Sequence, residues 1–158
     1  MDIKNKAGEL IYRGSTTGQA LTLRNLALRN ADFSNHNLQG AYFDECDLTG
    51  ADFQKADLYG AYLAFSSLND ASFAGASLRG ASLDNCLLRR TSFVSADLSP
   101  DNLDCPTSMQ KADLRGADFR DANLTRLAAE SSVFDKTTVF PSGCDPPAHG
   151  MVEVKQDS

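Results

Sequence analysis

The sequence has little of what enzymes and metal sites usually need. It contains no tryptophan and only two histidines in 158 residues, and its four cysteines, at positions 46, 86, 105 and 144, form no C-x-x-C pair or zinc-finger spacing. No histidine lies near a cysteine as a base, so the residues offer no nucleophile–base pair. Phosphate-loop and dinucleotide motifs are absent as well. We therefore expect no enzymatic activity, no cofactor and no metal site.

Long apolar segments and basic clusters are also scarce. No stretch approaches the roughly 20 apolar residues that cross a bilayer, and the first residues lack the apolar segment of a secretory signal. Acidic residues outnumber basic ones by 21 to 15, for a net charge of −6, which opposes direct binding to a nucleic-acid backbone. We expect a cytoplasmic chain with free thiols that contacts neither nucleic acid nor membrane.

A five-residue period runs through most of the chain. From Leu23 to Leu103 every fifth residue is large and apolar, and the residue two positions earlier is usually small. This period fits neither the helical repeat of 3.6 nor the strand repeat of 2. It indicates a chain that turns a corner every five residues, with two of each five side chains pointing inward. Glycine or asparagine often follows two positions after the large residue, as tight turns require.

A second period, of twenty residues, gives the number of corners in each coil. Phenylalanine recurs at this interval, and four pentapeptides per coil would stack these rings into a structural core of Phe33, Phe53, Phe73 and Phe93. Coils joined by backbone pairing rise about 4.8 Å each. The sequence thus predicts an all-β solenoid of about six coils, on the order of 29 Å long.

The repeats resemble the A-(D/N)-(L/F)-x-x motif of the pentapeptide-repeat family. Examples are the runs 51–55 (ADFQK), 56–60 (ADLYG) and 117–121 (ADFRD), and the match spans about three quarters of the chain. The resemblance implies a right-handed quadrilateral β-helix and little about activity. Characterised relatives include gyrase-interacting fluoroquinolone-resistance proteins, which are acidic dimeric rods that resemble B-form DNA. The amphipathic C-terminal helix through which those relatives pair has no counterpart here.

The period divides the chain into three parts. Residues 1–20 are expected to form an N-terminal cap, as a short strand pair or hairpin that covers the open end of the first coil. Residues 21–141 form the repeat region, with a one-residue register break near 104–108. The irregular segment 99–108 is interpreted as a tolerated insertion, with a binding loop as the alternative. Residues 142–158 are expected to be an irregular, proline-containing C-terminal tail.

Two groups of outward residues form the candidate interaction surface. With a constant twenty-residue coil, the acidic group makes two neighbouring rows, which are Asp32, Asp52 and Asp113 in one row and Asp57, Asp97 and Asp118 in the next. Aspartate is also the ordinary turn residue of such repeats, so a structural role is favoured. The aromatic group places Tyr42 over Tyr62 on another side, with Tyr59 and Phe65 at nearby corners.

These observations favour a non-enzymatic interaction or scaffold solenoid, monomeric or dimeric, that binds another protein. The alternative is an acidic mimic of DNA that acts on DNA gyrase, another topoisomerase or another DNA-binding protein.

Overall fold

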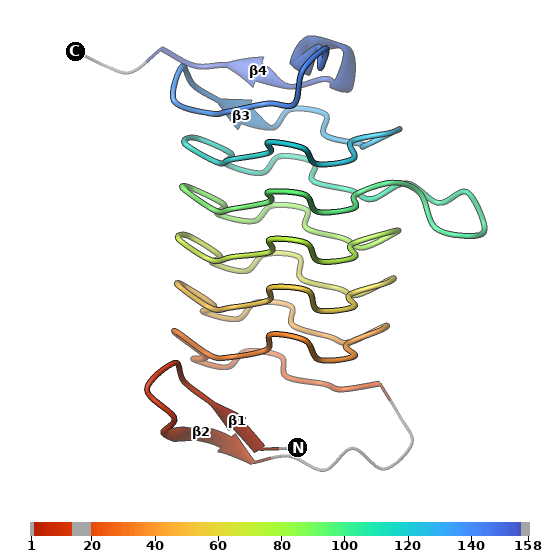
Figure 1. Cartoon of the computed structure of the whole chain (residues 1–158). Helices are drawn as coiled ribbons and strands as arrows, with labels where there is room; N and C mark the ends of the chain where they lie inside the picture. The colour runs from red at the N-terminus through yellow and green to blue at the C-terminus, as the bar shows by residue number, and fades with distance from the viewer. Residues whose placement is uncertain (1, 14–19, 156–158) are drawn as a thin grey trace.

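The computed structural model describes residues 2–13 and 20–155, and most of this chain winds into stacked coils (Figure 1). Neighbouring coils pair in parallel at a step of twenty residues; Asp52, for example, pairs with both Asp32 and Ser72. Backbone bonds follow this pairing, as in the N–H of Phe53, which donates to the carbonyl of Ser72 at 2.7 Å. Each coil is therefore held to the next by short parallel bridges instead of long strands.

The bridges form four outward columns, one on each face of the coil, and we number the faces in chain order. Face 1 carries Thr22, Tyr42, Tyr62, Ser82, Ser108 and Ala128. Face 2 carries Ala27, Asp47, Ser67, Leu87, Asp113 and Val133. Face 3 carries Asp32, Asp52, Ser72, Ser92, Asp118 and Val139. Face 4 carries Asn37, Asp57, Ser77, Asp97 and Asn123.

The corners between the faces are tight turns with a left-handed residue. In the corner after Phe53, the N–H of Ala56 donates to the carbonyl of Phe53 at 3.0 Å, and Lys55 has a φ of 57°. A turn with positive φ at its third position is typical of type II, which favours glycine and asparagine. This requirement explains why Gly60, with a φ of 62°, and Asn30, with 56°, follow the large inward residues by two positions.

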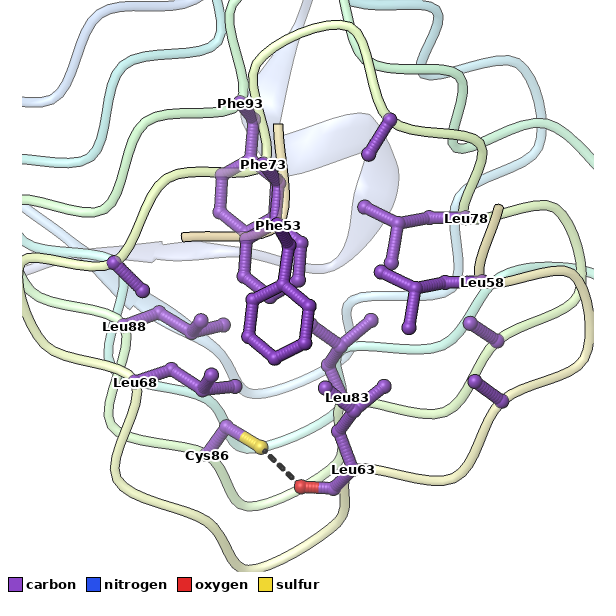
Figure 2. Packing of buried hydrophobic residues seen from close by; sticks show 14 of the residues in the cluster. Phe53, Leu58, Leu63, Leu68, Phe73, Leu78, Leu83, Cys86, Leu88 and Phe93 are labelled. Carbon is purple, nitrogen blue, oxygen red and sulfur yellow. Dashed lines mark hydrogen bonds between the residues drawn. The ribbon is translucent and has the colours of Figure 1, made fainter. Parts of the chain in front are cut away.

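The interior is a filled column of side chains. The rings of Phe33, Phe53, Phe73 and Phe93 stack with centroids 4.8 to 5.2 Å apart and nearly parallel planes, as the twenty-residue period predicts. Columns of leucine lie beside them in the same interior (Figure 2). The stack continues through Phe119 and Phe140, which the sequence period alone does not place there.

Small polar residues in the inward positions donate hydrogen bonds to the previous coil. The thiol of Cys86 donates to the carbonyl of Leu63 at 3.0 Å (Figure 2), and the hydroxyl of Ser66 donates to the carbonyl of Phe43 at 2.7 Å. Burial raises the pKa of Cys86 to about 12. The buried thiol is therefore a protonated structural donor and not a reactive group.

The register break is larger than one residue. Ser82 pairs with Ser108, a step of twenty-six residues where the earlier coils step by twenty. A further single residue is added later, because Asp118 pairs with Val139 at a step of twenty-one. The first insertion has six residues, which is one whole pentapeptide plus one, so the sequence period detects only the remainder. The extra length leaves the coil as a loop (Figure 1). Leu103, which the period places inward, lies in this loop and is 82% exposed.

The N-terminal residues form a hairpin along the first coil. Strands β1 (Asp2–Lys4) and β2 (Leu10–Arg13) pair antiparallel. The carbonyl of Lys4 accepts the N–H of Asp32 at 2.8 Å, and Ile3 is buried. The hairpin expected in this region is present in residues 2–13, while residues 1 and 14–19 of the expected cap lie outside the described residues.

The C-terminal segment differs from the irregular tail expected from its prolines. Strand β4 (Val152–Glu153) pairs parallel with β3 (Val133–Phe134) and so extends face 2 by one further level. The prolines lie in a short 3-10 helix, η1 (Pro146–His149), which brings the buried Met151 onto the last coil. Proline suits this position because the first residues of a helix need no N–H partner. Within residues 2–13 and 20–155, no helix has the length and apolar character of a membrane span.

Candidate interaction surface

Five of the six aspartates of the acidic group stabilise corners, and the sixth, Asp97, caps the start of the loop. Each accepts, on one side-chain oxygen, the backbone N–H of the residue two positions later, as Asp52 does from Gln54 at 2.9 Å and Asp32 from Ser34 at 3.0 Å. The side-chain and backbone bonds from Ser34 also lower the pKa of Asp32. The same bond is made by Asp57, Asp97, Asp113 and Asp118. These carboxylates are therefore turn caps first, whatever else they contact.

The two acidic rows are not arranged as the constant twenty-residue coil predicts. Because the six-residue insertion shifts all later residues, Asp113 lies on face 2 opposite Leu87, and Asp118 lies on face 3 opposite Ser92. Asp97 keeps its place on face 4 beside Asn123. In the outward columns that the structure describes, carboxylates occupy two successive levels only at Asp32 and Asp52.

Arginines neutralise much of the charge in the second half. Asp113 is nearly buried and accepts Arg89 Nε and Arg115 Nη2 on the same oxygen, each at 2.6 Å. Burial raises the pKa of Asp113, but the hydrogen bonds from Arg115 and Arg89 outweigh it and hold the pKa at about 2. Asp118 pairs with Arg120 in the same way, at 2.6 Å. The acidic group is thus a set of capped and partly paired carboxylates.

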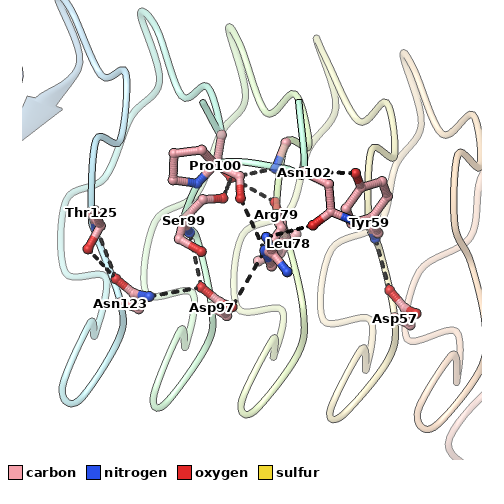
Figure 3. A network of polar contacts seen from close by, with 12 residues as sticks. Asp57, Tyr59, Leu78, Arg79, Asp97, Ser99, Pro100, Asn102, Asn123 and Thr125 are labelled. Atoms are coloured by element: carbon pink, nitrogen blue, oxygen red, sulfur yellow. Dashed lines mark hydrogen bonds and ion pairs between the residues drawn. The ribbon is translucent and has the colours of Figure 1, made fainter. Parts of the chain in front are cut away.

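Tyr59 contacts the loop and does not join the stack of Tyr42 and Tyr62. Its hydroxyl accepts the backbone N–H of Asn102 at 3.1 Å (Figure 3). Arg79 donates from Nε to the carbonyl of Pro100 at 3.1 Å and from Nη2 to Asn102 Oδ1 at 3.1 Å. The loop is therefore folded back along one corner and fastened to two earlier coils (Figure 3), with the exposed Leu103 beyond these anchors.

Face 1 carries an aromatic stack. The rings of Tyr42 and Tyr62 are 4.8 Å apart and nearly parallel, with an interplanar angle of 4°. The guanidinium of Arg24 lies 5.0 Å from the centroid of the Tyr42 ring and pairs with Asp44 at 2.9 Å. The predictions from the sequence do not include Arg24 and Asp44, although their separation by twenty residues, one coil length, could have identified them as a pair.

Phe65 is the unusual residue of this surface. It occupies the left-handed corner position, with a φ of 61°, and its side chain is 63% exposed. A bulky side chain rarely adopts this conformation, and exposure of the ring removes the hydrophobic gain that would offset the strain. A shallow hollow of about 300 Å³ adjoins it, lined by Arg24, Asn25, Asp44, Glu45, Ala64 and Phe65. We call Tyr42, Tyr62 and Phe65 the aromatic patch.

Comparisons with known proteins concern the repeat region. The family model for pentapeptide repeats matches in eight copies over residues 28–63, 66–99 and 107–134, which is more than half of the chain. No curated protein matches the sequence.

Three solved structures illustrate the likeness. A pentapeptide repeat protein from the Arabidopsis thaliana thylakoid lumen is 30% identical over 64% of this chain and 70% of its own, with a TM-score of 0.48. Rfr23 from the cyanobacterium Cyanothece 51142 is 22% identical over 77% and 85%, with a TM-score of 0.35. QnrB1, a plasmid-mediated fluoroquinolone resistance protein, is 14% identical over 87% and 79%, with a TM-score of 0.39.

The ion pairs of Asp113 predict a pH-dependent contribution to stability. A carboxyl whose pKa falls from 3.8 to about 2 on folding stabilises the fold above pH 3.8, and this stabilisation is lost as the pH falls toward 2. Asp113→Asn should lower the free energy of unfolding by about 1 to 2 kcal/mol at pH 7, allowing for the solvent around the arginines. Urea denaturation followed by circular dichroism at pH 7, 4 and 2.5 measures this difference.

The difference between wild type and Asp113→Asn should shrink toward pH 2.5. Asp52→Asn is the matched control, because Asp52 caps the same type of turn and has no ion pair among the described residues. A difference for Asp113→Asn that is constant across the three pH values would contradict the assignment.

Two phenylalanine substitutions should change stability in opposite directions. Phe65→Asn places a residue that tolerates positive φ at the corner and should stabilise the fold by about 1 kcal/mol. Phe73→Ala removes a fully buried ring from the stack and should destabilise by about 3 to 5 kcal/mol. The urea concentrations at the unfolding midpoints of the two variants and wild type measure these changes in stability. A loss of stability in Phe65→Asn would mean that Phe65 is needed for packing.

Proposed function

Because the chain belongs to the pentapeptide-repeat family, we propose that it is a non-enzymatic interaction solenoid that binds another protein through the aromatic patch. We infer a right-handed quadrilateral β-helix of about six coils over residues 21–141, which the four bridge columns and the stacked phenylalanines support. A cytoplasmic location remains a prediction from the sequence.

The observation that carries the proposal is the corner residue Phe65. Its conformation is unfavourable for a bulky side chain and its ring is 63% exposed, so folding gains little from a phenylalanine at this position. Strain of this kind is typical of residues retained for a contact outside the fold. Tyr62, three residues earlier on the same coil, is 46% exposed and adds a second ring. Exposed aromatic side chains are enriched in protein–protein contacts.

The filled interior supports a binding role over a catalytic one. The inward positions carry leucine, phenylalanine and small residues at near-zero exposure, and a catalytic site needs a concave pocket that shifts the pKa of its acids and bases. The aspartates accept turn N–H bonds, which lower the pKa of Asp32 instead of raising it toward neutrality. Members of this family are generally structural or interaction modules.

Affinity capture with matched variants tests the proposal. Wild-type chain, Tyr62→Ser with Phe65→Asn, and Leu103→Ser are immobilised and exposed to an extract of the producing cells. Serine and asparagine occur at equivalent positions of other coils, as in Ser82 and Asn85, so the double variant should fold. We expect the double variant to lose at least 90% of a partner that both wild type and Leu103→Ser retain, because the exposed Leu103 lies outside the patch.

The capture experiment has two informative failures. Loss of the partner in Leu103→Ser, with retention in the double variant, would move the contact surface to the loop around Leu103. Retention in every variant would remove the aromatic patch from consideration. Circular dichroism of each variant excludes loss of folding as the cause.

The alternative, an acidic mimic of DNA that acts on DNA gyrase or another DNA-binding protein, has less support. A mimic of duplex DNA needs regularly spaced negative charge along the rod. In the described columns the carboxylates are interrupted by serine, leucine and asparagine, and those at Asp113 and Asp118 are paired with arginines. We expect no change in supercoiling by DNA gyrase when the chain is added at micromolar concentration. Inhibition that weakens on Asp32→Asn with Asp52→Asn would favour the mimic instead.

A further inference from the structure

The ring of Tyr62 has one covered face and one open face. The covered face stacks on Tyr42, with ring centroids 4.8 Å apart. The opposite face is directed to the next coil, where the face 1 position holds Ser82. Serine has no ring to continue the stack, and Tyr62 is accordingly 46% exposed. The aromatic stack therefore ends in an open shelf above Tyr62.

The other end of the same stack shows what a tyrosine face of this column binds. The guanidinium of Arg24 lies 5.0 Å from the ring centroid of Tyr42, and its Nη2 is 2.9 Å from Asp44 Oδ2. A cation over an aromatic ring is attracted by the ring's electron-rich face, and a carboxylate fixes the guanidinium in orientation. One end of the stack is thus closed by an arginine and a carboxylate.

A carboxylate also stands at the level of the open shelf. Asp84 lies two coils beyond Asp44 on the same corner. Its Oδ1 accepts hydrogen bonds from the N–H of Gln110 at 2.8 Å and from the hydroxyl of Ser108. Among the described residues, its Oδ2 accepts only one long bond, from the hydroxyl of Ser82 at 3.4 Å. Within residues 2–13 and 20–155 no cation pairs with Asp84. Oδ2 therefore retains capacity for a strong donor.

We propose that the shelf above Tyr62 is the docking site for an arginine side chain of a partner protein. The guanidinium stacks on the open face of Tyr62 and donates to Asp84 Oδ2. These are the two kinds of group that hold Arg24 at the other end of the column, except that Asp84 belongs to the coil beyond the ring, because position 64 on the ring's own coil is alanine. The proposal rests on the proposed function and names the contact that the aromatic patch makes.

Charge and shape select arginine among other planar groups. Glu45, at the same corner two coils before Asp84, is a second carboxylate without a partner in the described ion pairs, and the chain carries a net charge of −6. A nucleotide would bring its phosphate against these carboxylates. A lysine carries the right charge but has no planar surface to lie on the ring.

Nuclear magnetic resonance with short peptides tests the site directly. Isotope-labelled protein is titrated with acetyl-Gly-Ser-Arg-Ser-Gly-amide and with the same peptide carrying lysine in place of arginine. The expected Kd is about 10 mM, so each titration extends to about 100 mM, roughly ten times this value. We expect saturable shifts of the Tyr62 ring and of the Ser82 and Asp84 amides with the arginine peptide. The lysine peptide should bind at least three-fold more weakly.

Variants separate the site from general attraction to an acidic surface. Asp84→Asn keeps an acceptor for Ser108 and Gln110 and removes the charge, and it should weaken binding of the arginine peptide at least five-fold. Asp57→Asn removes a half-buried charge from face 4 and should leave binding unchanged. Equal binding by wild type and Asp84→Asn, or no saturable shift of the Tyr62 ring up to the highest concentration, would overturn the proposal.

The outcomes are distinguishable from those of the capture experiment. If the partner is lost from the double variant of Tyr62 and Phe65 but retained by Asp84→Asn, the aromatic patch binds a protein and the arginine site is wrong. If the arginine peptide binds as expected while capture is insensitive to the patch, the arginine site stands and the proposed function is wrong. The amide spectrum of each variant verifies that it is folded.

Discussion

A left-handed backbone corner returns every five residues, and the stacking of the coils depends on it. The corners at Asn30, Lys55 and Gly60 all have φ between 56° and 62°. Because each corner turns the chain onto the next face in the same way, outward residues one coil apart lie side by side and bridge in parallel. An aspartate before the corner accepts the N–H that the turn leaves without a partner. Much of the acidic content of the chain is therefore a consequence of the turn and not of a charged ligand.

The parts of the fold that repeat are the parts that the sequence predicts. The phenylalanine column follows from spacing alone, because residues twenty apart occupy the same inward position on successive coils of four pentapeptides. Asp113 and Asp118 were assigned to the wrong faces, because a five-residue pattern reports an insertion only as the remainder after whole repeats are subtracted. The real insertion of six residues turns all later residues by one face. Phe119 enters the stack above Phe93 for the same reason.

Features that depend on contacts between distant residues were not predictable in this way. The prolines near position 146 suggest an irregular tail, yet β4 is held by the backbone of β3 and by the burial of Met151. The sequence predicts Tyr59 to be a surface aromatic residue, whereas in the structure its hydroxyl accepts a hydrogen bond from the N–H of the loop residue Asn102. The stack of Tyr42 and Tyr62 was predictable, since both residues lie on the twenty-residue period. Arg24, which covers the end of this stack, was not predictable, because many corner positions of the repeat carry polar residues and nothing in the period distinguishes this one.

A repeat fold leaves few positions free to carry a specific contact. Inward positions are occupied by the core, and the residue before each corner is best an aspartate, asparagine or serine that caps the turn. What remains are outward residues that cap nothing and corner residues that depart from the turn's preference. Tyr62 is of the first kind and Phe65 is of the second. Their coincidence on one coil, beside a carboxylate that no cation neutralises within the described chain, is what the coil geometry by itself does not require. A contact with a basic partner accounts for all three features together.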